Sequence, residues 1–72
     1  MRSELALQIL QYLYDRSGRQ IDIGELEVQI GKDIHVLRPA IEDLKTNGFI
    51  NEEEYRLEIL PPGKHFAQSR WV

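Results

Sequence analysis

Helical segments followed by a strand-like segment predict an α+β fold for this chain of 72 residues. Three stretches before residue 47 carry apolar residues at spacings of three and four, the period of a helix that packs on a core. After residue 49, apolar and charged residues alternate as they do in a half-buried strand. Three short helices cannot bury their apolar stripes alone, so we expect a small sheet to pack on their open side.

The first predicted helix runs from Ser3 to Asp15, with Ser3 as its N-cap and Gly18 as a left-handed residue after its end. One face carries Leu5, Ile9, Tyr12 and Leu13. The other side carries Leu7, Leu10 and Tyr14. A helix that is apolar nearly all round is usually covered on two sides.

A second, shorter helix is expected in RQIDIGELEVQIG, with the apolar stripe Ile23, Leu26 and Ile30. Asp22 is the N-cap, and Glu25 completes the D-x-x-E arrangement of a capping box. Gly31 ends the helix. Ile21, just before the cap, is a candidate for a short edge strand between the first two helices.

Asp33 caps the third predicted helix, whose core stripe is Leu37, Ile41 and Leu44. Asn47-Gly48 ends this helix in a turn. Pro39 lacks a backbone donor and lies six residues past the cap. It either bends the helix or delays the start of the helix to near Pro39, and both alternatives stay open.

A β-hairpin is expected next, beginning at Phe49-Ile50. The run NEEE is interpreted as a tight connection, and Tyr55, Leu57 and Ile59 alternate with charged residues in the second strand. LPPG ends the hairpin. The remaining KHFAQSRWV is expected to be a short tail, with one helical turn as its candidate structure.

In order and spacing, these elements resemble the winged helix–turn–helix family of small prokaryotic transcription regulators. The stretch IDIGELEVQIG resembles the positioning helix, and KDIHVLRPAIEDLKTNGFI resembles the recognition helix and first wing strand. The second strand and exit are matched by YRLEILPPGKHFA. The resemblance implies a single winged-helix domain over residues 1–72, with a three-helix core and a C-terminal hairpin as the wing.

The resemblance also implies a DNA-binding regulator whose third helix enters the major groove of double-stranded DNA. When Leu37 faces the core, the residues that point outward are His35, Pro39, Glu42 and Thr46. Arg38 flanks them and can pair with guanine through both guanidinium donors. The candidate DNA-binding residues are Lys32, His35, Arg38, Lys45 and Lys64.

The charge distribution favours an alternative, a winged-helix protein–protein interaction module without DNA contact. The chain carries a net charge of −3. The segment from Lys32 to Ile50 has three basic and three acidic residues, whereas Asn51 to Glu58 has four glutamates and one arginine. Such a wing lacks the attraction to phosphate that supplies most non-specific affinity. A protein partner would use Val36 and Pro39, or the acidic wing.

The second apolar face of the first helix needs a cover. The tail, through Phe66 and Trp71, is one candidate, and a second copy of the chain that pairs through the first helix as a homodimer is another. A different protein is the third. The candidate interaction surface is Leu7, Leu10, Tyr14 and Trp71.

Several functions are not expected from this sequence. The chain has no cysteine, and its two histidines lie too far apart in sequence for a confident metal site. Glycine-rich phosphate loops and nucleophile motifs are absent from it, so neither an enzyme nor a cofactor is expected. The N-terminus MRSELALQIL does not resemble a signal peptide, and no apolar run approaches the roughly 20 residues of a membrane span. We therefore expect a cytoplasmic protein with no membrane contact.

Overall fold

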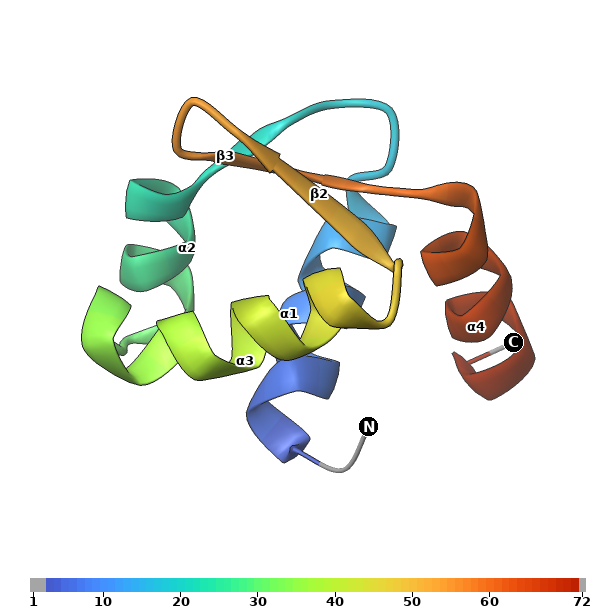
Figure 1. The fold of residues 1–72 in the computed structure, drawn as a ribbon, viewed down its shortest axis with the longest axis horizontal. Coiled ribbons are helices and arrows are strands. Elements are labelled where there is room, and N and C mark those ends of the chain that lie inside the picture. The colour runs from blue at the N-terminus through green and yellow to red at the C-terminus, as the bar shows by residue number, and fades with distance from the viewer. Residues whose placement is uncertain (1–2, 72) are drawn as a thin grey trace.

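The computed structural model describes residues 3–70 and the backbone of residue 71. Its elements, in order, are α1 (Glu4–Asp15), β1 (Ile21–Asp22), α2 (Ile23–Ile30), α3 (Ile34–Thr46), β2 (Ile50–Glu53), β3 (Arg56–Ile59) and α4 (Pro61–Trp71). The strands form an antiparallel sheet in the order β1-β3-β2, and the helices lie to one side of it (Figure 1). The predicted α+β class is confirmed.

Helix α1 begins where the sequence predicts, because the hydroxyl of Ser3 accepts a hydrogen bond from the backbone N–H of Ala6 at 3.2 Å. Its buried residues are Ala6, Ile9, Leu10 and Leu13. They meet the buried side chains of α2, α3 and the sheet in one core. Among the described residues, no buried side-chain polar atom lacks a hydrogen-bond partner.

The predicted edge strand and the predicted N-cap of α2 are confirmed, but the capping box is not. Ile21 pairs with Leu57, and the carboxylate of Asp22 accepts from the N–H of Gly24 at 2.7 Å. Glu25 does not reach back to its cap. Its carboxylate accepts from the hydroxyl of Tyr12 at 2.6 Å and from Arg19 at 2.9 Å. A hydrogen bond from a cation is stronger than one from a neutral N–H, so Glu25 binds Arg19 of the loop after α1, and its bond with Tyr12 joins α2 to α1.

Helix α3 begins at Ile34 and continues through Pro39, so the prediction of a delayed start is wrong. Asp33 caps it by accepting from the N–H groups of His35 and Val36 at 2.8 and 3.3 Å. Proline removes the donor for the carbonyl four residues earlier, which belongs to His35. Both residues lie on the exposed side of the helix, where water can replace that donor.

Gly48 ends α3 as predicted. With a φ of 75°, Gly48 directs its N–H to the carbonyl of Lys45 at 2.9 Å. The N–H of Phe49 reaches the carbonyl of Leu44 at 3.0 Å. These two bonds satisfy carbonyls that a helix end leaves free, and they turn the chain into β2.

The hairpin turn lies later than predicted. Strand β2 extends through Glu53, which pairs with Arg56, so the turn consists of Glu54 and Tyr55 alone. Their φ angles are 52° and 63°. Two successive positive φ values are typical of a type I′ turn, the two-residue turn that matches the strand twist. Tyr55 is therefore 45% exposed at the tip rather than inside a strand.

The tail is a full helix, α4, where a short tail was predicted. Pro61 begins α4 without the loss of a hydrogen bond, because the first N–H groups of a helix have no partner within it. Gly63 lies so close to the hairpin that an added Cβ would meet the carbonyl of Phe49 and lie 2.9 Å from Cγ1 of Ile59. The rings of Phe49 and Phe66 stack at 4.9 Å. Helix α4 also packs on α1.

Candidate functional site

Helix α3 has one buried side and one open side. The buried side consists of Leu37, Ala40, Ile41 and Leu44. The open side consists of His35, Val36, Pro39, Glu42 and Thr46, all of which are exposed. No other part of the described chain covers this face, which is the face that the sequence predicts to point outward.

The two basic side chains along the middle of α3, Arg38 and Lys45, are bound in ion pairs. Arg38 donates to Oε1 of Glu52 at 2.6 Å and to Oε2 of Glu42 at 3.2 Å. Lys45 donates to the same two oxygens, at 3.1 and 3.2 Å. These four residues form a closed ring of alternating charge, which we call the charge ring. Its net charge is zero.

Glu52 is the least exposed member of the charge ring. Its side chain is 16% exposed, against 35% for Arg38 and 52% for Glu42. The hydrogen bond from Arg38 lowers the pKa of Glu52 below its ordinary value, and the hydrogen bonds to Glu52 raise the pKa values of Arg38 and Lys45. Each of these three groups is therefore held in its charged form by the others.

The role of Glu52 was missed because NEEE was interpreted as a turn. In β2, Glu52 is two residues after the buried Ile50 and pairs with the buried Leu57, so it lies on the sheet face that turns toward the helices. Because successive side chains of a strand point to opposite faces, an apolar residue would be expected at this inward position. An acidic residue at this position requires basic partners from a neighbouring element, and α3 supplies them.

The N-terminus of α3 is also occupied by carboxylates. Glu27, on α2, accepts from the N–H of Ile34 at 2.7 Å, and Asp33 accepts from the next two N–H groups. The first amides of a helix are a ready site for phosphate when they are free. In α3 they are satisfied from within the chain. The part played by Glu27 has no local sequence signal, because it lies seven residues from its partner.

The remaining candidates occupy different places. Lys32 and His35 are exposed at the N-terminal end of α3, and within residues 3–70 neither takes part in an ion pair. Lys64 is half-buried in the first turn of α4, which packs on α1 rather than beside the open face of α3. The structure thus brings Arg38 and Lys45 together, with Lys32 and His35 toward one end of the same helix.

The predicted interaction surface on α1 is mostly covered. Leu10 is fully buried, and Leu7 and Tyr14 are half-buried. The side chain of Trp71 lies outside the described residues. Of the alternatives for the cover of this face, the structure shows the tail, as α4. The residues of α1 that stay exposed are polar ones, Glu4, Gln8 and Asp15.

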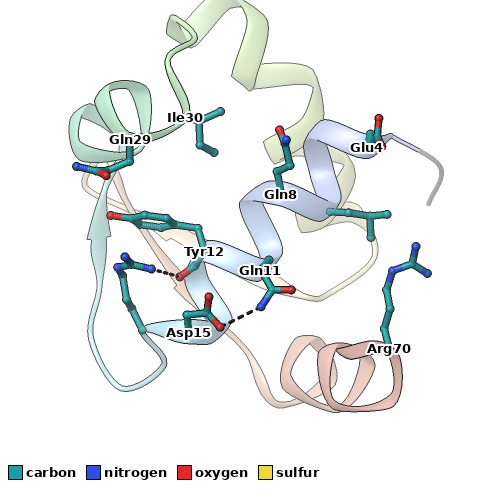
Figure 2. A pocket seen from close by; sticks show the side chains of 10 residues that line it. Glu4, Gln8, Gln11, Tyr12, Asp15, Gln29, Ile30 and Arg70 are labelled. Carbon is teal, nitrogen blue, oxygen red and sulfur yellow. Dashed lines mark hydrogen bonds between the residues drawn. The ribbon is translucent and has the colours of Figure 1, made fainter. Parts of the chain in front are cut away.

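A groove of about 670 Å³ lies between α1, α2 and α4, and its lining includes this polar stripe as well as the apolar side chains of Leu7 and Ile30. Figure 2 shows Gln29 and Ile30 on its α2 side and Arg70 on its α4 side. The groove carries acidic residues at both ends of α1, Glu4 and Asp15. Arg16 and Arg70 line the same groove, so its acidic and basic residues are equal in number, and a homodimer through α1 stays a prediction.

The described residues give no sign of other site types. No three potential metal ligands come together among them. No helix formed by these residues has the length and apolar character needed to cross a membrane.

Comparisons with known proteins find no match, whether to a protein-family model, to a curated protein or to a solved structure. The resemblance to winged-helix proteins therefore rests on the sequence pattern and on the arrangement of the elements.

Proposed function

We propose that this protein is a small winged-helix DNA-binding protein, a transcriptional regulator that places α3 in the major groove of double-stranded DNA. The order of helices and strands supports the proposal, with α2, the Gly31 turn and α3 as the helix–turn–helix and the β2–β3 hairpin as the wing. The sheet order β1-β3-β2 is compatible with this fold.

The open face of α3 is the observation that carries the proposal. The helix has 13 residues, is buried along one side and is uncovered along the other. A major groove, about 12 Å wide, accepts a helix presented in this way. Lys32 and His35 would approach phosphates or base edges at the N-terminal end, and Arg38 would pair with guanine while Lys45 contacts phosphate.

The neutral charge of the same face favours a second candidate, a winged-helix module that binds protein. The charge ring cancels Arg38 and Lys45, and carboxylates occupy the first amides of α3. Val36 is 47% exposed and, together with Pro39, offers a small apolar contact on α3. A partner of this kind would bind with little dependence on salt.

A salt titration with duplex DNA separates the two candidates. DNA affinity should be highest at about 20 mM salt, and its logarithm should fall linearly with the logarithm of the salt concentration toward about 200 mM. The reason is that each lysine or arginine that binds a phosphate releases counterions from the duplex. Arg38→Ala should weaken binding roughly tenfold, the scale of one lost arginine–guanine pair. Arg19→Ala is the matched control.

Arg19 is also an arginine in an ion pair, with Glu25, but it belongs to the loop between α1 and β1, and Figure 1 shows this loop away from α3. Its removal should change affinity by no more than the small effect of one distant charge. Absence of binding by the unchanged protein at the lowest salt would rule out the DNA proposal.

A further inference from the structure

We propose that Glu52 limits non-specific DNA binding, because it holds Arg38 and Lys45 in the charge ring and keeps them from phosphate. This inference rests on the proposed DNA-binding function and concerns the regulation of the same surface. Glu52 acts through the two cations, so it is a positioning residue and not a DNA contact.

The stoichiometry of the charge ring is the first step. Two cations share two carboxylate oxygens, Oε2 of Glu42 and Oε1 of Glu52, in four contacts of 2.6 to 3.2 Å. Arg38 donates to both carboxylates through Nη1, and Lys45 through Nζ, so the charge of each cation is already balanced within the ring. The net attraction of the α3 face for a phosphate backbone is therefore small as long as the ring is closed.

The position of Glu52 is the second step. It belongs to β2, its strand pairing is fixed opposite Leu57, and its side chain is 16% exposed beneath α3. Glu52 cannot follow the cations outward, whereas Arg38 and Lys45 have long, flexible side chains on the helix surface. An approaching duplex must compete with Glu52 for both of them.

The third step concerns which part of the duplex can compete with the carboxylates for Arg38. A backbone phosphate offers two oxygens that share one negative charge in place of two carboxylates, so the exchange brings little gain. A guanine edge is uncharged, so its pairing with Arg38 depends on donor geometry and not on the net charge that the ring cancels, and the ring contacts use only Nη1 of Arg38. The ring thus penalises contacts to the backbone alone more than contacts to a matching base.

The test removes the ring's carboxylates one at a time and measures binding to a mixed-sequence duplex. Glu52→Gln leaves one cation in excess, so the slope of log affinity against log salt should steepen by about one unit, since each phosphate contact contributes about 0.9. Affinity near 0.1 M salt should rise roughly tenfold. The double variant Glu42→Gln, Glu52→Gln should steepen the slope by about two units.

Glu53→Gln is the matched control. Glu53 is the next residue of β2, is exposed, and forms no ion pair within the described chain. If loss of negative charge alone mattered, the more exposed Glu53 would have at least the effect of Glu52. We expect Glu53→Gln to change affinity by less than about twofold and to leave the salt slope unchanged.

Each outcome is informative. Equal effects of Glu52→Gln and Glu53→Gln on a protein that binds DNA would overturn the inference and leave the proposed function standing. DNA binding by Glu52→Gln but not by the unchanged protein would overturn the proposed function and, with it, the inference that rests on it. No binding by any variant at low salt would overturn both. Circular dichroism checks folding, and Glu42→Gln opens the same ring without touching β2.

Discussion

Single residues in this protein have roles that depend on partners far along the chain. Gly63 was expected to end the hairpin, but it lies inside α4 at a point where the helix touches Phe49. Glu52 was expected in a turn, but it forms ion pairs with two basic residues of α3. In both positions the residue type is explained by a neighbour that local sequence patterns do not reveal.

Replacement of Gly63 by alanine should destabilise the protein by about 2 kcal/mol or more, as overpacking of a tight contact does. In an ordinary helix position the same change would stabilise the protein by up to about 1 kcal/mol, so the sign of the change in the free energy of unfolding is the test. Gln68→Ala, at an exposed position of α4, is the control and should shift the free energy by less than about 0.5 kcal/mol. Urea unfolding measures both. An unchanged or raised stability for Gly63→Ala would contradict the close contact.

Acidification should lower the free energy of unfolding, in part through Glu52. Its pKa is lowered in the folded state by Arg38 and Lys45, the cations that face it from α3. Its contribution to stability is therefore present above the ordinary glutamate pKa, about 4.3, and is lost as pH falls through the lowered value. The free energy of unfolding should fall less for Glu52→Gln than for the unchanged protein between about pH 7 and about pH 3. Glu53→Gln should behave like the unchanged protein, and identical pH profiles for all three would contradict the assignment.

Among the elements, the helices with strong local signals were predicted best. The caps Ser3, Asp22 and Asp33 lie at the predicted starts, and Gly31 and Gly48 lie at the predicted ends. These signals act within one helical turn, so the sequence displays them directly. Helix α4 and the hairpin turn were predicted less well, because a pair of prolines or a run of glutamates is usual in loops.

The hairpin turn should be improved by residues that tolerate positive φ. Glu54 and Tyr55 adopt left-handed conformations, which cost a residue with a side chain about 1 kcal/mol or more. Replacing them by Asn-Gly should raise the free energy of unfolding by about 1 kcal/mol, because this pair suits a type I′ turn. Asn-Gly at Glu53 and Glu54, one residue earlier, is the control and should destabilise. Thermal or urea unfolding measures the stability of both variants. A loss of stability for Asn-Gly at Glu54 and Tyr55 would contradict the turn position.

At the scale of the whole molecule, the sequence predicted the α+β class and the face of α3 that is open. It named the tail as one of three candidate covers of α1 but did not decide among them, because this contact joins segments some 50 residues apart and has no local pattern. Nor did it predict the charge ring, although both of its acidic residues were counted as charges opposed to DNA. In the charge ring, Glu42 and Glu52 bind Arg38 and Lys45, so these two glutamates do more than add negative charge.

The affinity of the unchanged protein for a mixed-sequence duplex, measured from about 20 to about 200 mM salt, tests most directly whether α3 binds DNA. We expect weak binding at low salt, which falls as salt rises and which Arg38→Ala reduces but Arg19→Ala does not. No binding at the lowest salt, or binding that is independent of both salt and Arg38, would contradict the proposed DNA binding.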